Sequence, residues 1–207
     1  MPDSIRWVRD SAEFRALVAQ TYREAATGVA SAAAGRQNGS WAVILDADET
    51  VISNLQYQIE LAQAGRAYSS ESWRAWVARR EATPLPGASA FLARVHELGG
   101  YIAIVTNRLQ SECADTEAVF KTYKLTYDAM LCRPDNGPSD KNPRFAAVAA
   151  GTPATGGTPR EVVVFVGDNI LDFPGMTQAA AKADAAASEH FGVKYFMLPN
   201  PMYGSWQ

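Results

Sequence analysis

Apolar runs that end abruptly in polar residues recur along this chain. The clearest is Trp-Ala-Val-Ile-Leu at 41–45, which is followed at once by Asp-Ala-Asp-Glu-Thr. Similar runs occupy 101–105, 162–166 and 195–198, and a weaker one occupies 127–131. Continuous apolar runs of this length are typical of strands buried on both faces. Because helical stretches alternate with them, the pattern predicts an α/β fold, a doubly wound parallel sheet whose polar strand ends meet at one edge.

Helical periodicity accounts for much of the remaining sequence. Before the first strand, apolar residues follow one helix face over 11–34, with Asp10 and Glu13 at the expected start and Gly35 after the end. These apolar residues are Phe14, Leu17, Val18, Tyr22, Ala25 and Val29. Near the other end of the chain, the alanine-rich stretch 176–188 is expected to form a helix packed closely on the sheet.

The interval between the first two strands is unusually long. It contains about fifty residues, more than one crossover helix needs. Trp73, Trp76, Val77 and Arg80 share one helix face within it, and Ser69 or Ser70 can cap that helix. We therefore expect a single domain over 1–207 with a small α-helical cap within about 51–90, packed with the helix over 11–34.

Composition narrows the choice of partners. A net charge of -3, a pI near 5.4 and the lack of basic runs argue against a nucleic-acid polymer. The two histidines and two cysteines lack zinc-site spacing (His96, Cys113, Cys132 and His190). We therefore expect any bound metal to be one that prefers oxygen ligands, such as Mg²⁺. No signal peptide or membrane span is apparent, which predicts either a cytoplasmic protein or a mature form without its leader.

Two carboxylates at the end of the first strand carry the main chemical hypothesis. Asp46 could attack a phosphoryl group, and Asp48 could serve as general acid for the leaving oxygen, so that an aspartyl phosphate forms and is then hydrolysed. The alternative for this segment is structural, because acidic residues also end strands and cap helices.

Other strand ends supply complementary groups. Thr106 and Asn107 can donate hydrogen bonds to phosphate oxygens, and Lys141 can supply a positive charge. Asp168 and Asp172 can supply oxygen ligands for a divalent cation facing Asp46. Each has a structural alternative (a helix cap, a surface lysine, a turn), but their common placement at strand ends favours one phosphoryl-transfer site.

These residues carry a resemblance to a known family. The ordered set resembles the four motifs of the haloacid dehalogenase superfamily: Asp46-x-Asp48-x-Thr50, Thr106-Asn107, Lys141 and Gly167-Asp168-Asn-x-x-Asp172. More narrowly, the chain is similar to bacterial class C acid phosphatases, which include outer-membrane lipoprotein nucleotidases. That likeness is carried by the nine residues from Asp46 to Asn54, Trp73-x-x-Trp76, Pro86-Gly87 and the closing segment Leu198-Pro-Asn-Pro-Met-Tyr-Gly-Ser-Trp206.

The resemblance implies a haloacid dehalogenase-like fold and a role for each motif. Asp46 would be nucleophile and magnesium ligand, and Asp48 acid and base with its backbone carbonyl on the ion. Asp168 would complete the ligands, and Asp172 would act through water or support the shell. Thr106 and Lys141 would hold the phosphoryl oxygens. The family also implies 5'-nucleotides and aryl phosphates as substrates and a periplasmic or outer-membrane-associated mature form. A cytoplasmic location and a homodimer are left open.

Aromatic residues near the motifs suggest how a leaving group is bound. Tyr57, Trp73 and Tyr203 are expected to border the crevice and bind substrate, and Trp73 and Tyr203 are expected to stack on a nucleotide base. Trp76 is expected instead to be the buried face of the cap helix. Cys113 and Cys132 are interpreted as two separate buried thiols, although both fall near one edge of the sheet.

Two other classes of protein remain as alternatives. A receiver-like phosphoacceptor also gathers acids, a threonine and a lysine at a sheet edge, but it has adjacent acids on its first strand and lacks a helical cap. A non-catalytic nucleotide-binding module could keep the fold without turnover. Magnesium-dependent hydrolysis of p-nitrophenyl phosphate separates the phosphatase from both.

Overall fold

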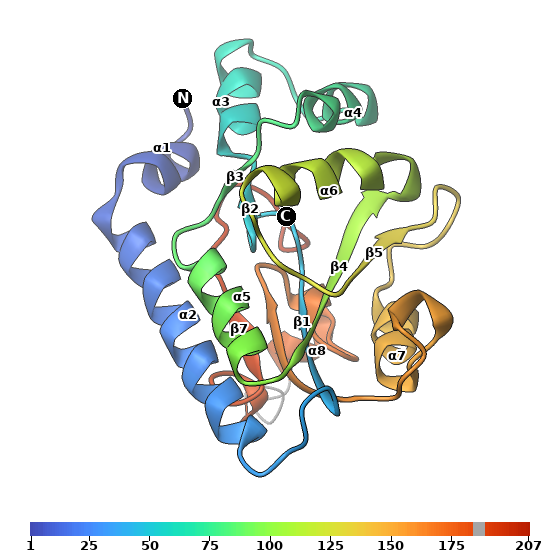
Figure 1. Ribbon diagram of the computed structural model, residues 1–207. Coiled ribbons are helices and arrows are strands. Elements are labelled where there is room, and N and C mark those ends of the chain that lie inside the picture. Colours follow the sequence, from blue (N-terminus) through green and yellow to red (C-terminus); the bar gives the residue numbers. More distant parts are fainter. Residues whose placement is uncertain (184–188) are drawn as a thin grey trace.

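A five-stranded parallel sheet forms the centre of the computed structural model, which describes residues 1–183 and 189–207 (Figure 1). Its strands are β1 (Trp41–Leu45), β4 (Tyr101–Leu109), β5 (Ala129–Arg133), β6 (Glu161–Gly167) and β7 (Tyr195–Met197). They lie in the order β5-β4-β1-β6-β7, and every pairing is parallel. The predicted doubly wound α/β fold is confirmed, with β1 in the middle of the sheet.

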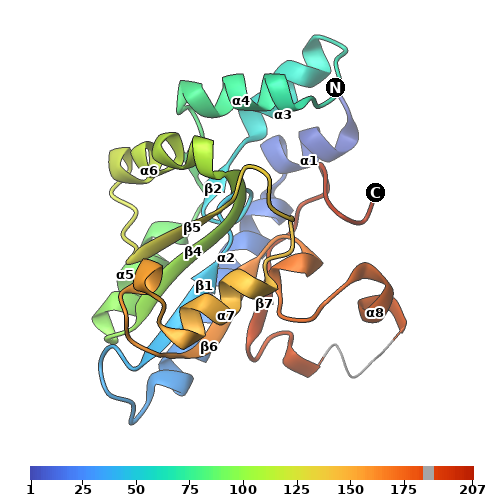
Figure 2. The ribbon, with the colours of Figure 1, turned by 90° about the vertical axis from the view of Figure 1, so that its right-hand side faces the viewer.

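Helices cover both faces of the sheet (Figure 2). One core contains residues of α2 (Ala12–Ala33), α5 (Ala88–Glu97) and α6 (Cys113–Thr122) together with Val43 and Leu45 of β1. The other core contains Phe145 and Val148 of α7 (Asn142–Ala150) together with Ala42 and Ile44. Because successive strand residues point to opposite faces, the continuous apolar run of β1 serves both cores.

The predicted cap stands over the carboxyl ends of the strands (Figures 1 and 2). It consists of α3 (Leu55–Gln63) and α4 (Ser70–Arg79), and it joins the sheet through two short antiparallel strands, β2 (Ile52–Ser53) and β3 (Thr83–Pro84). Ser69 caps α4, with its hydroxyl accepting a hydrogen bond from the backbone N–H of Ser72 at 3.1 Å.

The N-terminal segment forms two helices where one was expected to follow Asp10. The first, α1 (Asp3–Asp10), contacts α3 of the cap, whereas α2 lies along α5, β6 and β7. The break falls at Ser11, whose hydroxyl accepts from the backbone N–H of Phe14 at 3.0 Å and so caps α2 in place of Asp10. The helix expected over 11–34 therefore packs mainly against the sheet layer, and α1 meets the cap.

The alanine-rich segment differs from its prediction. Only α8 (Gln178–Ala183) forms within it; none of its residues is buried, and 184–188 lie outside the described residues. Figure 2 shows α8 standing away from the sheet. Alanine offers little apolar area to bury, and larger side chains next to it, Phe173 and Phe191, pack on Tyr195 of β7 instead. The prediction of a helix packed closely on the sheet was wrong.

The two cysteines form a disulfide, which corrects the prediction of separate thiols. Cys113 begins α6 and Cys132 lies in β5, with their Cα atoms 6.1 Å apart. Parallel pairing of β4 with β5 continues to Leu109 opposite Arg133, which brings the chain leaving β4 beside the end of β5. Both residues are buried, as predicted, but within reach of one another.

The other elements in the described residues are short 3₁₀ turns, η1 (Gln110–Glu112), η2 (Pro153–Thr155) and η3 (Ile170–Asp172). Within the described part of the chain, no helix has both the length and the apolar character required to cross a membrane.

Candidate active site

The nucleophile candidate, Asp46, directly follows the central strand. Its backbone N–H donates to the carbonyl of Val166 at 3.0 Å, so the parallel pairing with β6 extends to this residue. The chain then turns tightly: the carbonyl of Ala47 accepts from the N–H groups of Val51 and Ile52, and Glu49 adopts a left-handed conformation with φ 51°. This turn places the side chains of Asp46 and Asp48 at the same edge of the sheet, as the strand-end argument predicted.

Three carboxylates meet around one lysine at this edge. Oxygen atoms of Asp46, Asp168 and Asp172 all lie within 4.8 Å of one another. The buried ammonium of Lys141 donates to both Asp46 and Asp172, the latter at 2.6 Å. Asn200 donates to Asp168 at 2.8 Å, and the other Asp172 oxygen accepts from the N–H of Asn169. The structure thus brings together four of the predicted site residues.

The protonation of these groups reflects their crowding. Burial raises the pKa of Asp46 to about 7; the charges of Asp172 and Asp48 add to the rise, and Lys141 opposes it. Burial and the neighbouring acids Asp172 and Asp46 also raise the pKa of Asp168 well above its ordinary value. Burial alone would lower the pKa of Lys141, but the two carboxylates it contacts outweigh this and raise it.

A hard divalent cation fits this cluster. The three acids lie beside a single ammonium that contacts only Asp46 and Asp172, so the cluster favours a further positive charge such as a divalent cation. Carboxylate oxygens are the ligands that magnesium and calcium prefer. Here Asp172 presents an oxygen as close to the others as Asp168 does, so direct ligation by Asp172 is as compatible with the geometry as a role through water.

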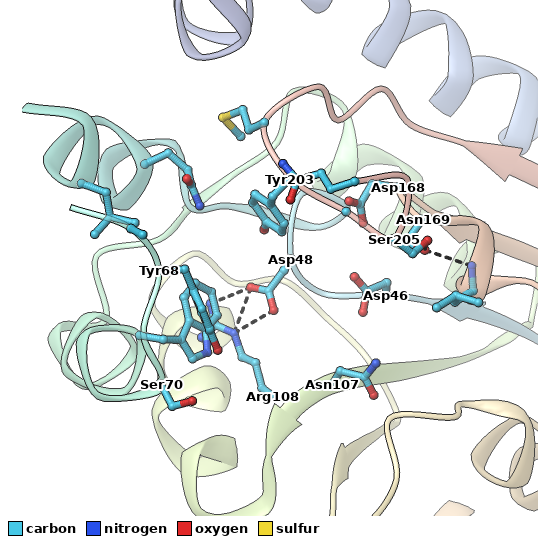
Figure 3. Close-up of a pocket in the computed structure, with 18 of the residues that line it drawn as sticks. Asp46, Asp48, Tyr68, Ser70, Asn107, Arg108, Asp168, Asn169, Tyr203 and Ser205 are labelled. Carbon is cyan, nitrogen blue, oxygen red and sulfur yellow. Dashed lines mark hydrogen bonds and ion pairs between the residues drawn. The ribbon is translucent and has the colours of Figure 1, made fainter. Parts of the chain in front are cut away.

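Asp48 points away from the cluster toward the cap. Figure 3 shows its carboxylate turned to Arg108, which donates from Nε at 3.0 and 3.2 Å and from Nη2 at 2.8 Å. Asn54 donates to the same carboxylate at 2.8 Å. Asp48 therefore occupies the side of Asp46 that faces the cavity, where a leaving group would lie.

A buried polar network surrounds Asp48 and was missed by the sequence reasoning. Asn54, fully buried, donates to Asp48 and Glu49 and accepts from Trp76 and Arg108. Burial, with the nearby charge of Asp48, raises the pKa of Glu49 to about 8 against the opposing hydrogen bonds of Asn54. Asn54 belongs to the segment from Asp46 to Asn54 that carries the family resemblance, but its residue type alone does not indicate hydrogen bonds to four side chains.

The second motif divides into a buried and an exposed residue. Thr106 is fully buried, and its hydroxyl accepts from the backbone N–H of Arg108 at 3.1 Å. Asn107 lines the cavity, and its carbonyl oxygen accepts from Arg144 at 2.6 Å. Because the guanidinium of Arg144 takes the amide oxygen, the amide N–H₂ of Asn107 is left to face the cavity as a donor. Arg144 is a second functional candidate that the sequence reasoning missed.

A cavity of about 760 Å³ opens above these groups, and only some of the predicted aromatic residues line it. Trp73 and Tyr203 line it, as does the exposed Tyr68, which was not anticipated (Figure 3). Tyr57 does not: it is 3% exposed, packs edge-on against Trp73 and shares a hydrogen bond with Ser72. Its predicted place at the border of the crevice is therefore not supported, because its ring is buried against Trp73 and does not line the cavity. Trp76 is buried, as predicted.

Comparison with known proteins places this geometry in context. A family profile described as "HAD superfamily, subfamily IIIB (Acid phosphatase)" matches residues 1–206. The solved class C acid phosphatase from Bacillus anthracis is 27% identical, with a TM-score of 0.87 over 98% of this chain and 84% of that chain. A crystal structure of that organism's class C acid phosphatase with tungstate bound is 26% identical, with a TM-score of 0.86 and the same coverage.

A more distant likeness concerns the fold alone. A chain in the structure of the Pnkp1/Rnl/Hen1 RNA repair complex is 15% identical, with a TM-score of 0.51 over 82% of this chain and 44% of that chain.

Proposed function

The chain belongs to subfamily IIIB of the HAD superfamily, the acid phosphatases, and from this premise we propose a magnesium-dependent hydrolase that works through an aspartyl phosphate on Asp46. Its proposed substrates are small phosphomonoesters, 5'-nucleotides and aryl phosphates in particular. The observation that carries the proposal is the contact of Asp46 with Lys141 at the floor of a cavity whose cap side holds Asp48. Membership of this enzyme family sets aside the receiver and the non-catalytic binding module.

The first half-reaction transfers the phosphoryl group to the protein. A carboxylate oxygen of Asp46 attacks phosphorus, a new P–O bond forms to Asp46, and the bond from phosphorus to the leaving oxygen breaks. A proton passes from Asp48 to that oxygen, so the alcohol or phenol departs neutral. Lys141 and the amide of Asn107 stabilise the charge on the phosphoryl oxygens. The Thr106 hydroxyl accepts from the N–H of Arg108, and this leaves its own hydrogen to be donated to a phosphoryl oxygen.

The second half-reaction returns the protein to its starting state. Water attacks phosphorus and gives a proton to Asp48, the bond from phosphorus to the Asp46 oxygen breaks, and inorganic phosphate leaves. Asp46 is again a carboxylate and Asp48 again carries a proton. Asp46, Asp168 and Asp172 would hold a magnesium ion here, and its charge would offset that of the nucleophile and the phosphoryl oxygens. The predicted ligation by the Asp48 carbonyl stays part of this proposal.

The walls of the cavity support a flat leaving group. Trp73 on the cap and Tyr203 in the closing segment both border it. The Tyr203 hydroxyl donates a hydrogen bond to Glu49, which fixes the orientation of the ring. A base stacked on such a side chain contributes roughly 1 to 3 kcal/mol of binding free energy. This supports 5'-nucleotides and aryl phosphates over sugar phosphates as preferred substrates.

The disulfide bears on the compartment. Disulfides persist in oxidising compartments and are rare in the cytosol. The Cys113–Cys132 bond therefore favours the periplasmic or outer-membrane-associated location, and a homodimer stays a prediction.

The decisive experiment measures turnover of p-nitrophenyl phosphate and its dependence on Mg²⁺. Asp46→Asn should reduce hydrolysis of p-nitrophenyl phosphate by at least about a hundredfold, because an amide cannot attack phosphorus. Asp10→Asn, an exposed change on α1, serves as the matched control. EDTA should abolish the wild-type rate and Mg²⁺ restore it, while tungstate, bound in a solved class C acid phosphatase, should inhibit competitively. Full activity of Asp46→Asn would overturn the nucleophile assignment.

A further inference from the structure

Arg108 is the most fully engaged side chain beside the proposed general acid. It is 2% exposed, and its guanidinium donates to both oxygens of Asp48 in a fork. The remaining donors reach Asn54 Oδ1 at 3.0 Å and Thr116 Oγ1 at 3.2 Å. A planar guanidinium held at this many points has one orientation, and it imposes that orientation on the carboxylate it grips.

The same guanidinium forms the support for the aromatic wall of the cavity. Its central carbon lies 5.3 Å from the centre of the Trp73 ring, within the range of a cation–π contact. Trp73 in turn packs edge-on against Tyr57. Trp73, Arg108 and Asp48 are therefore consecutive members of one contact chain that runs from the cap to the site of proton transfer.

The geometry of phosphoryl transfer indicates what the contacts from Trp73 through Arg108 to Asp48 could do. In-line attack by Asp46 requires the leaving oxygen to lie on the far side of phosphorus, toward the cavity and the cap. Asp48 must be held on that side, although it follows Asp46 by only two residues. Arg108 and Asn54 are the groups that hold it there.

We propose that Arg108 is a positioning residue for proton transfer: it fixes the Asp48 carboxylate beside the departing oxygen and ties that position to the Trp73 wall that receives the leaving group. This rests on the proposed function, in which Asp48 is the acid. A buried ion pair is weak evidence of stability, since desolvation offsets most of its attraction. Lysine would supply charge at one point without the fork, so Arg108→Lys should lose the positioning and keep the charge.

The test measures single-turnover phosphorylation with two esters, p-nitrophenyl phosphate and an alkyl phosphate. Help from a general acid matters most for poor leaving groups. Arg108→Gln should slow phosphorylation by the alkyl ester on the order of a hundredfold, and by the nitrophenyl ester less than about tenfold. Arg108→Lys should show the same selectivity and comparable losses, because it keeps the charge but lacks the fork. Arg74→Gln, which removes a positive charge from another residue lining the cavity, should leave the ratio of the two rates unchanged.

A double variant separates positioning from a general structural role. If Arg108 acts through Asp48, then Asp48→Asn/Arg108→Gln should be no slower with the alkyl ester than Asp48→Asn, because the shared effect is already lost. The inference is overturned if Arg108→Gln slows phosphorylation by the two esters by the same factor, or if its losses multiply with those of Asp48→Asn. If Asp48→Asn instead slows phosphorylation by the alkyl ester and the nitrophenyl ester equally, Asp48 is not the general acid. Thermal unfolding of each variant identifies any that fail to fold.

Discussion

Replacing both cysteines by alanine is expected to lower the stability of the protein by an amount that the loop length sets. Cys113 and Cys132 are separated by 19 positions in the sequence. Closing a loop of that size in the unfolded chain contributes about 3 kcal/mol of stability on the chain-entropy account. For a protein of this size, each kcal/mol shifts the midpoint of thermal unfolding by roughly 2 to 4 °C. The double variant should therefore melt roughly 6 to 12 °C below the oxidised wild type.

The assay compares three samples by thermal unfolding: oxidised wild type, wild type reduced with dithiothreitol, and Cys113→Ala/Cys132→Ala. Agreement between the second and third samples shows that the loss comes from the cross-link and not from the two missing sulfur atoms. Thiol titration of the denatured, unreduced protein should find no free thiol, since both cysteines are paired. The loop-closure reasoning is refuted if all three samples melt within about 2 °C of one another, a shift that corresponds to less than about 1 kcal/mol.

Three further predictions follow from the site. A Cβ at Gly167 would overlap Asp172, so Gly167→Ala should reduce magnesium affinity and kcat together by about tenfold or more. A titration of the rate with Mg²⁺ checks this. Asp168→Asn should raise the metal-free melting temperature by removing a buried like charge and should abolish stabilisation by Mg²⁺; an unchanged magnesium-induced shift would count against ligation. Trp73→Ala should raise KM for a 5'-nucleotide about tenfold with less effect on a sugar phosphate, and Tyr203→Phe, which keeps its ring, should not.

The clustering of the acidic residues and the lysine could be predicted from the sequence because it depends on topology alone. Once the apolar runs are recognised as parallel strands, right-handed crossovers force their carboxyl ends to one edge. Asp46, Lys141 and Asp168 meet for this reason, and no detail of side-chain packing is needed to foresee it.

Residues whose roles depend on the path of the chain beyond the strand ends could not be foreseen. Arg108 reaches Asp48 because β4 continues past the apolar run to Leu109. The pairing of Cys113 with Cys132 depends on where α6 begins relative to β5. Tyr57 and Trp73 are both aromatic and both near the motif, but the packing of α3 against α4 leaves Tyr57 buried against Trp73 while Trp73 lines the cavity. Such angles are set by packing, which a periodic pattern does not encode.

The paired strands β2 and β3 give the cap a narrow base. Ile52 lies opposite Pro84 and Ser53 opposite Thr83, so the chain departs toward the cap and returns from it at adjacent points. Asp46 directly follows β1 and pairs with β6, so its place depends on the sheet and not on the residues between these two points. The molecule is thus divided into a portion that fixes the reaction and a portion that can diverge with the leaving group. New preferences can arise by grafting a different insertion onto an unaltered phosphoryl-transfer platform.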